Sequence, residues 1–267
     1  MMNTTRARLL QEMGISPVWR LRRLTAAEEV EVQEAQEARM QDAPPPVAEN
    51  VAPPAAPSGI ASPEERGQRI AALEWPELEE EIRSCAACGL CAQRKQAVPG
   101  VGDRKAEWLF IGEGPGAEED IQGEPFVGQA GKLLDAMLAA IALKRGANVY
   151  IANAVKCRPP ANRTPETGEI AVCWPFLRRQ IALIRPRLIV LLGRVAARAV
   201  LDREVTLNAL RGKTHEYRDG DFSCPLIVTW HPAYLLRNLP DKRKAWEDLC
   251  FARETIRKSL TEQSRST

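Results

Sequence analysis

Three side chains able to support bond cleavage stand at the ends of apolar segments of this chain. Glu113 follows an apolar run that ends at Ile111, Asn153 lies in a second run, and His231 follows a third. A carboxylate on a turn after a buried strand is typical of a reaction centre. An imidazole in such a place can stabilise negative charge that develops on a leaving group. A lone histidine is more often structural, but the strand end and the proline that follows favour a role for His231 in a site.

The segment 112–131 is rich in glycine and proline and carries five carboxylates. Glycine and proline weaken helices and strands, so this segment is predicted to be a loop that needs unusual backbone conformations. Taken alone, an acidic loop is more often a solvated surface than a site. We therefore expect Glu118, Asp120 and Glu124 to be surface charges, with Glu113 facing the chemistry.

The spacing of apolar residues predicts a sheet whose strands alternate with helices. Apolar segments typical of buried strands lie at 108–111, 149–155, 188–192 and 226–230. Segments with helical spacing lie between them, at 132–143, 166–184 and 195–201. This order indicates an α/β domain with a parallel sheet covered on both faces. In such sheets ligands bind beyond the carboxyl ends of the strands, so the segments that follow the four strands should meet in one crevice.

The first part of the chain differs in composition from the rest. Residues 6–23 are basic with spaced leucines, 26–40 are rich in Ala, Glu and Gln, and 42–63 are dominated by Pro and Ala. This composition predicts a largely disordered tail over residues 1–66, with a short basic helix and a polyproline-type linker. A docking peptide for a protein partner is the alternative for the basic segment. We expect the folded domain to cover 67–260 and residues 261–267 to be disordered.

Length, charge and hydropathy limit the class of protein. The 267 residues are enough for a sizeable core, and 37 basic against 35 acidic residues give a net charge of +2. A nearly neutral chain neither requires nor excludes a nucleic-acid partner. The sequence contains neither an apolar run of the length that spans a membrane nor a secretory leader. We therefore expect a monomeric cytoplasmic protein without membrane contact, whose cysteines are metal ligands or free thiols.

Four of the seven cysteines have a spacing suited to a metal centre. Cys85 and Cys88 form a C-x2-C pair, and Cys157 and Cys173 flank a proline-rich loop. Four thiolates suit either a structural zinc or a [4Fe–4S] cluster, and the unequal spacing of the second pair is unlike that of a zinc ribbon. Cys91 is near enough in sequence to compete as a ligand, and spacing does not exclude it.

We expect structural or surface roles for two further cysteines, for His215 and for a basic segment. Cys224 begins a predicted strand and Cys250 lies in a helical pattern, so both are expected to be buried thiols. His215 is expected to be a loop residue. The basic residues 242–244, just past His231, are usually a solvated face, but beside a crevice they can hold phosphates.

Several motifs, taken together and in order, resemble those of the family 4, iron–sulfur uracil-DNA glycosylases. They are GEGPG at 112–116, GEPFVG at 123–128, KCRPP at 156–160 and HPAYLLR at 231–237, together with Asn153 and the four spaced cysteines. The resemblance covers residues 68–258. It implies a three-layer α/β/α sandwich with a four-stranded parallel sheet. It also implies a [4Fe–4S] cluster on Cys85, Cys88, Cys157 and Cys173, with a structural role in holding the loops that face DNA.

The resemblance implies a function in base excision repair of DNA. A uracil inside a DNA stack is out of reach, so the enzyme would flip the deoxyuridine into the crevice and hydrolyse its N-glycosidic bond, leaving an abasic site. Phe126 would stack on the base, and the amide of Asn153 would pair with its polar edge. His231 would stabilise the departing uracil anion, while Glu113 would hold the attacking water or face the sugar cation.

The same resemblance assigns secondary roles to four residues. Glu119 and Asn162 match further motif positions and would order the water or the loop. Gly114 would let the backbone approach the base, and Arg237 would press against the DNA backbone or the minor groove. The implied partner is uracil-containing DNA, single- or double-stranded.

Other branches of the superfamily and one different class of protein are alternatives. The branch that traps uracil sites covalently uses a histidine in the loop that corresponds to 158–167, and this loop contains none here. A branch with an alanine-rich first motif lacks the acid that Glu113 supplies. The remaining alternative is a non-catalytic DNA-binding or polymerase-associated module that docks through the N-terminal segment. A hydrolytic glycosylase is the expectation that these residues favour.

Overall fold

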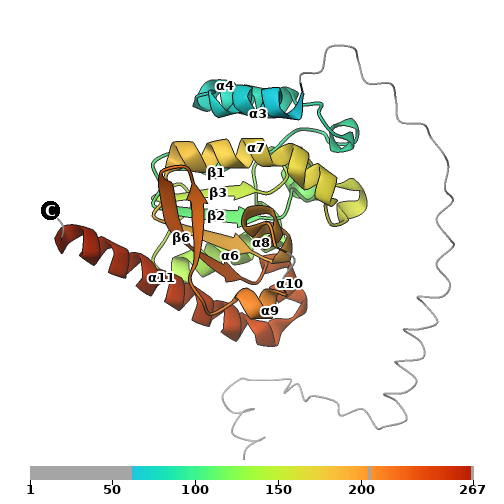
Figure 1. Cartoon of the computed structure of the whole chain (residues 1–267). Coiled ribbons are helices and arrows are strands. Elements are labelled where there is room, and N and C mark those ends of the chain that lie inside the picture. Colours follow the sequence, from blue (N-terminus) through green and yellow to red (C-terminus); the bar gives the residue numbers. More distant parts are fainter. Residues whose placement is uncertain (1–61, 204–205, 266–267) are drawn as a thin grey trace, which may run out of the picture. The chain divides into compact units, whose positions relative to one another are not determined.

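The computed structural model describes residues 62–203 and 206–265, and its centre is a parallel sheet (Figure 1). Four parallel strands form the middle of the sheet in the order β3-β2-β4-β6. They are β2 (Trp108–Gly112), β3 (Val149–Asn153), β4 (Leu188–Leu192) and β6 (Phe222–Thr229). All residues of β2, β3 and β4 are buried, as continuous apolar strands covered on both faces require. The expected α/β architecture is confirmed.

Two antiparallel edge strands extend this sheet to six strands within the described residues, instead of the four expected. They are β1 (Val101–Gly102), which pairs with β3, and β5 (His215–Asp219), which pairs with β6. Neither shows an apolar run, because β1 has two residues and β5 is an edge strand with alternating exposed side chains. His215 therefore begins a strand and is not a loop residue.

Helices cover both faces of the sheet. Figure 1 shows α7 (Thr167–Ile184) on one side and α6 (Gln129–Ala140) on the other. With α7 lies α8 (Arg194–Leu201), and with α6 lies α11 (Lys242–Arg265). Alternate residues of β2 point to opposite sides, Leu109 into the α7 core and Phe110 into the α6 core. The three-layer arrangement implied by the resemblance is thus present.

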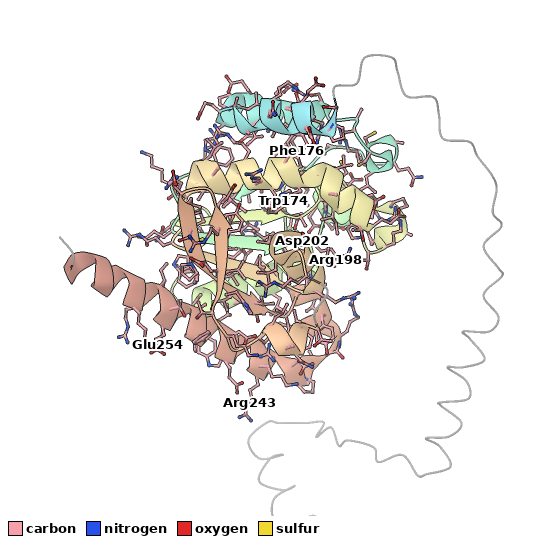
Figure 2. All side chains as sticks on the ribbon, in the orientation of Figure 1. Trp174, Phe176, Arg198, Asp202, Arg243 and Glu254 are labelled. Atoms are coloured by element: carbon pink, nitrogen blue, oxygen red, sulfur yellow. The ribbon has the colours of Figure 1, made fainter. Side chains whose placement is uncertain are left out.

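An outer pair of helices, α3 (Pro63–Ala71) and α4 (Trp75–Ser84), packs on α7. Phe176 lies between α7 and this pair (Figure 2), and the guanidinium of Arg66 stands 4.8 Å from the centre of its ring. These two helices begin the path of the chain into Cys85, the residue that ends α4.

Short helical elements complete the loops near the carboxyl ends of the strands. They are η1 (Gly89–Ala92), α5 (Ala117–Gln122), η2 (Pro160–Asn162), α9 (Leu207–Leu210), α10 (Pro232–Arg237) and η3 (Leu239–Asp241). The strand register brings these loops together, because Gly112 of β2 pairs with Asn153 of β3 and Leu192 of β4 pairs with Thr229 of β6.

Helices extend past both bounds expected for the folded domain. The helix α3 begins at Pro63, where Ser62 and Glu65 form a capping box and proline occupies a position that favours helix starts. The helix α11 continues to Arg265. The tail expected for residues 1–66 lies outside the described residues as far as residue 61, as does its expected docking role. Among the helices that the structure describes, none has the length and apolar character needed to span a membrane.

Candidate active site

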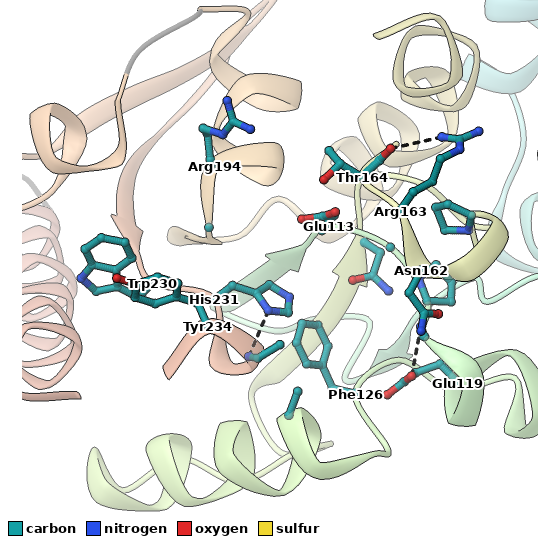
Figure 3. Close-up of a pocket in the computed structure, with 18 of the residues that line it drawn as sticks. Glu113, Glu119, Phe126, Asn162, Arg163, Thr164, Arg194, Trp230, His231 and Tyr234 are labelled. Carbon is teal, nitrogen blue, oxygen red and sulfur yellow. Dashed lines mark hydrogen bonds between the residues drawn. The ribbon is translucent and has the colours of Figure 1, made fainter. Parts of the chain in front are cut away.

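One pocket lies beyond the carboxyl ends of the parallel strands (Figure 3). All residues that the sequence assigned to catalysis, to the base or to DNA line it: Glu113, Gly114, Glu119, Phe126, Asn153, Asn162, His231 and Arg237. They come from the loops after β2, β3 and β6. The rim also carries Arg194, from the loop after β4, so all four parallel strands contribute as the topology predicts.

Asn153 is the polar group in the floor of the pocket. Its side chain is 2% exposed, and its Oδ1 atom has no hydrogen-bond partner among the described residues. A buried acceptor without a partner costs free energy, about 1–3 kcal/mol, so such a group in a pocket indicates a ligand that donates to it. The main-chain oxygen of Asn153 accepts from the buried ammonium of Lys156 at 2.9 Å, which fixes the strand end that carries the amide.

Phe126 forms the wall beside Asn153 and has an unusual backbone conformation. Its φ of 57° lies in the left-handed region, and its side chain is buried. Arg145 holds this conformation by donating to the main-chain oxygens of Pro125 and Phe126, both at 2.8 Å. Gly131 is required nearby, because a Cβ there would stand 1.8 Å from the Phe126 oxygen. Arg145, which sequence reasoning missed, thus positions the stacking wall from a distant loop.

Glu119 organises the loop that carries Phe126. Its Oε1 accepts from the main-chain N–H of Val127 at 2.9 Å and of Gly128 at 3.1 Å, and its Oε2 accepts from Gly116 at 3.0 Å. With both carboxylate oxygens bound to backbone, Glu119 is suited to ordering the loop, the second of the two roles expected for it.

His231 faces the ring of Phe126, with ring centres 5.4 Å apart and an angle of 32° between the planes (Figure 3). It precedes α10, and its Nδ1 accepts the N–H of Ala233 at 3.2 Å. Burial and, to a smaller extent, the charge of Arg237 lower the pKa of His231 to about 4, against the opposing effect of Glu119. The ring is therefore neutral at pH 7. Because Nδ1 accepts, the proton of the neutral ring resides on Nε2.

Glu113 and Glu119 are the carboxylates among the described residues that line the pocket. Glu113 directly follows β2 and is partly buried. Desolvation raises the pKa of Glu113 above its usual range, while the charges of Arg194 and Arg198 oppose this rise. Arg194 is exposed at the start of α8, on the rim shown in Figure 3. No motif had singled out Arg194 for this electrostatic role.

The loop after β3 brings Asn162 to the pocket in a second unusual conformation. Ala161 and Asn162 both have positive φ, 50° and 56°. The guanidinium of Arg158 donates to Asn162 Oδ1 at 2.8 Å, which leaves the amide N–H groups of that side chain for other partners. Arg237 lies exposed in the last turn of α10, as its expected contact with DNA requires.

Five cysteines gather around a second, smaller cavity, lined by Cys85, Cys88, Cys91, Cys157 and Cys173. Within residues 62–203 and 206–265, no three His, Cys, Asp or Glu side chains are grouped so that they could hold one metal ion. Thiols around a common cavity are the donor type of a [4Fe–4S] cluster and also of a structural zinc. Cys91 lines the same cavity, so the geometry keeps it as a competitor.

Nitrogen donors surround these thiols. Arg94 donates to Cys157 Sγ at 2.8 Å, and the main-chain N–H of Lys156 donates to Cys173 Sγ at 3.3 Å. Burial raises the pKa of both thiols, and these donors oppose that rise in the direction of the thiolate form that metal binding needs. The residues present therefore fit an anionic cluster.

Some surface assignments made from the sequence need correction. Glu118 and Glu124 are exposed as expected, but Asp120 is buried and accepts from the main-chain N–H groups of Lys95 and Gln96. It ties α5 to the segment that follows η1. Cys224 is buried as expected.

The expectation for Cys250 also needs correction. Cys250 is partly exposed on α11, whereas its helical pattern had predicted burial.

Comparison with known proteins agrees with this site. Residues 99–250 match the model of the uracil DNA glycosylase superfamily. The type-4 uracil-DNA glycosylase of Archaeoglobus fulgidus is 45% identical over 175 residues, which are 64% of this chain and 87% of that protein. Those of Pyrobaculum aerophilum and Thermotoga maritima are each 42% identical, over 67% and 68% of this chain and 93% and 94% of their own lengths. This chain belongs to the uracil DNA glycosylase superfamily and, within it, to the type-4 enzymes.

Proposed function

We propose that this protein releases uracil from DNA by hydrolysing the N-glycosidic bond of a flipped deoxyuridine. The observation that carries the proposal is the buried Oδ1 of Asn153, which has no hydrogen-bond partner among the described residues and lies in a pocket beside Phe126 and His231. Membership of the type-4 enzymes supports the same reaction.

Recognition of uracil follows from the chemistry of the pocket floor. Uracil carries an N–H between two carbonyl oxygens, so Asn153 Oδ1 can accept from that N–H while the amide nitrogen donates to a carbonyl. Cytosine has an acceptor where uracil has the N–H, and it would leave the buried oxygen unpaired. Phe126, held in place by Arg145 and Glu119, supplies the stacking surface.

Two side chains then act on the N-glycosidic bond, one at the leaving group and one at the attacking water. The electron pair of the N-glycosidic bond leaves with uracil, and the neutral His231, with its proton on Nε2, donates a hydrogen bond to the oxygen on which the charge develops. Glu113 in its ionised form orients a water toward the sugar carbon and takes its proton as the C–O bond forms. The products are uracil and an abasic site.

The cysteine cavity is proposed to hold a [4Fe–4S] cluster on Cys85, Cys88, Cys157 and Cys173. The cluster would supply a rigid crosslink between the end of α4, the loop after β3 and α7. That loop carries Asn162, so the metal would act on the site through the position of the loop. We propose uracil-containing DNA as the partner and a monomer in the cytoplasm as the working form.

The chain has two histidines, so His215 provides a matched control for a substitution of His231. His231→Asn and Glu113→Gln are compared with His215→Asn, a control on β5, in single-turnover assays on DNA with one uracil. We expect each site variant to lose about 100-fold or more in rate, by analogy with the loss of one oxyanion donor or one general base. His215→Asn should keep the wild-type rate. Equal rates for His231→Asn and wild type would exclude the proposed mechanism.

A further inference from the structure

The rings of Trp230 and Tyr234, which flank His231 in the sequence, stack on each other. Their centres are 4.5 Å apart and their planes differ by 11°. Trp230 directly precedes His231, and Tyr234 lies in the first turn of α10. Both rings also line the site pocket. The chain therefore turns at His231, between two residues whose rings are in contact with each other.

Backbone hydrogen bonds join this stack to His231. The main-chain oxygen of His231 accepts from the N–H of Tyr234 at 2.9 Å and of Leu235 at 3.2 Å. Its Nδ1 accepts from Ala233, as described above. Tyr234 therefore belongs to the same helix turn that holds the backbone and the Nδ1 atom of His231.

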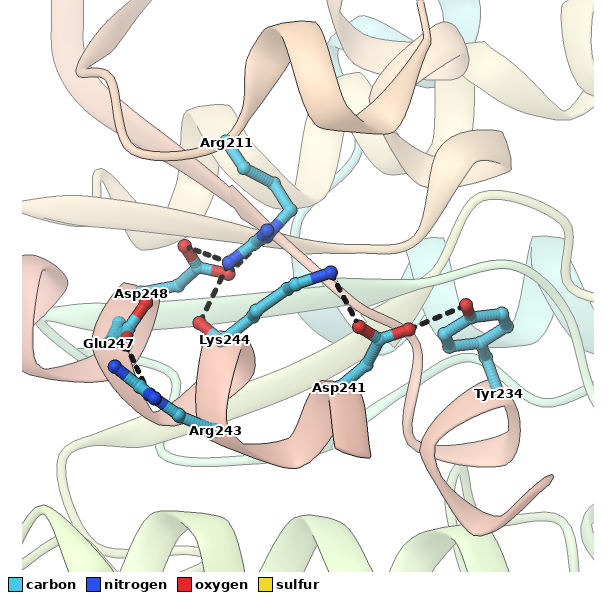
Figure 4. A network of polar contacts seen from close by, with 7 residues as sticks. All are labelled: Arg211, Tyr234, Asp241, Arg243, Lys244, Glu247 and Asp248. Atoms are coloured by element: carbon cyan, nitrogen blue, oxygen red, sulfur yellow. Dashed lines mark hydrogen bonds and ion pairs between the residues drawn. The ribbon is translucent and has the colours of Figure 1, made fainter. Parts of the chain in front are cut away.

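Tyr234 is anchored on its outer side (Figure 4). Its hydroxyl donates to Asp241 at 2.7 Å, and Asp241 forms an ion pair with Lys244 at 2.8 Å. Asp241 ends η3 and Lys244 lies in α11, so the outer edge of the stack is tied to the long C-terminal helix.

The ring of Trp230 lies beside a second, buried group of polar contacts, while its own Nε1 has no hydrogen-bond partner among the described residues. The guanidinium of Arg211 stands 5.4 Å from the centre of its ring and donates twice to Asp248, at 2.7 and 3.0 Å. Asp248 is 3% exposed and also accepts the hydroxyl of Thr229 at 2.7 Å. Figure 4 shows Arg211 and Asp248 on one side of the network and Asp241 with Tyr234 on the other. A buried ion pair of this kind holds a fixed geometry.

Gly193 and Phe126 limit the space around the other sides of His231. A Cβ on Gly193, whose φ is 90°, would stand 2.9 Å from the Cβ of His231. Phe126 faces the imidazole. With these two contacts and the stack behind it, the imidazole has few other orientations available.

We propose that the Trp230–Tyr234 stack positions His231, with Tyr234 as the positioning residue that keeps Nδ1 on the Ala233 N–H and Nε2 directed at the base. The catalytic consequence rests on the proposed function, whereas the position of His231 does not. A misplacement of about 1 Å in a catalytic group lowers rates by up to about 100-fold, so the stack should act on kcat more than on KM.

Histidine-selective 15N labelling tests the position directly, because the chain gives two histidine signal sets and His215 is an internal control. Tyr234→Leu removes the stack, and Tyr234→Phe keeps the ring while removing the hydroxyl. We expect the His231 signals of Tyr234→Leu to shift toward mixed tautomers, with those of His215 unchanged. Tyr234→Phe should restore most of the wild-type pattern. Unchanged His231 signals in folded Tyr234→Leu would overturn the proposal.

Kinetics and a stability control complete the test. On uracil DNA we expect kcat of Tyr234→Leu to fall between about 10- and 100-fold, with recovery in Tyr234→Phe. Tyr217→Leu, which breaks the Tyr217–Phe222 contact at the other end of β6, should lower stability without moving the His231 signals. A fall in kcat without movement of His231 signals would contradict positioning and indicate direct contact with DNA.

Two further results need an interpretation: a Tyr234→Leu variant that does not fold, and a wild-type protein that releases no uracil. If Tyr234→Leu does not fold, Tyr234→Met keeps an unbranched apolar side chain but removes the ring from the stack, and a shift of the His231 signals in the same direction is expected. Absence of that shift would overturn the proposal. If wild-type protein releases no uracil while the His231 signals still respond to Tyr234→Leu, the proposed function fails and the positioning of His231 stands.

Discussion

Phe126 Cζ and Asn153 Oδ1 both lie 2.5 Å from the point where a Cβ on Gly112 would stand. Because the last residue of β2 is a glycine, the ring of Phe126 and the amide of Asn153 can both occupy this space. This contact joins the loop after β2 to the end of β3, the neighbouring strand.

Replacing Gly112 with alanine should disrupt the site more than the fold. The added methyl group must displace Phe126 or Asn153, so we expect Gly112→Ala to lower kcat/KM on uracil DNA by about 100-fold. Gly168→Ala in α7 is the matched control, because its Cβ would meet nothing within 4 Å. Alanine there should be neutral or stabilising by up to about 1 kcal/mol. Wild-type kcat/KM in Gly112→Ala would show that the two side chains do not act together.

Glu119→Gln should loosen the loop that holds Phe126. An amide has one acceptor oxygen, so either the Gly116 N–H or the pair from Val127 and Gly128 loses its partner. Each lost bond to a partly buried N–H costs about 1–3 kcal/mol, so thermal unfolding should report a lower stability. Steady-state kinetics on uracil DNA should report a higher KM. Glu118→Gln, an exposed neighbour, should change neither quantity. Equal unfolding temperatures for the two variants would contradict the assigned contacts.

The acid limb of the pH–rate profile should report Glu113. The ionised carboxylate is the active form, so kcat/KM falls as the pH decreases through the pKa of Glu113, which burial holds above its usual value. Arg194→Gln removes a charge that lowers this pKa, and the limb should move to higher pH. His231, with a pKa of about 4, stays neutral over this range.

The control for this shift is Arg218→Gln. Arg218 of β5 lies opposite Ser223 of β6 in the strand register, at the end of the sheet away from the pocket. Its acid limb should coincide with that of wild type. A limb that Arg194→Gln leaves in place would mean that another group limits the rate at low pH.

Loss of a cluster ligand should be visible as loss of iron. Cys157→Ser and Cys173→Ser, purified without oxygen, are expected to lose most of the bound iron and sulfide and the visible absorbance. Cys224→Ser, at a buried thiol outside the cavity, should retain them. Cys91→Ser decides the role of the fifth thiol: retention of four irons per chain would assign the cluster to the other four cysteines. Stoichiometric zinc in wild-type protein would contradict the cluster.

The parallel core of the fold was predictable because its strands are short, continuous apolar runs. The segments at 108–111, 149–155, 188–192 and 226–230 correspond to β2, β3, β4 and β6. The edge strand β5 was missed because its exposed side chains are polar, and α5 was missed because its acidic residues lie between glycines.

The grouping of site residues at one sheet edge was predictable from topology, but their contacts were not. Strand ends place Glu113, Asn153 and His231 together. The support by Arg145 and Arg211 depends on tertiary contacts between distant loops, which neither periodicity nor a motif encodes. Asp120 was misassigned for the same reason, because its partners lie on a segment far away in sequence.

Release of free uracil by the wild-type protein is the most direct test of the central claim. The purified full chain is incubated with single- and double-stranded oligonucleotides that carry one uracil, and with matched oligonucleotides that carry cytosine or thymine in its place. We expect one free uracil per uracil-containing strand, an abasic site at that position, and no release from the matched strands. Binding of the uracil DNA with the base still attached, or a permanent covalent adduct in place of turnover, would contradict this claim.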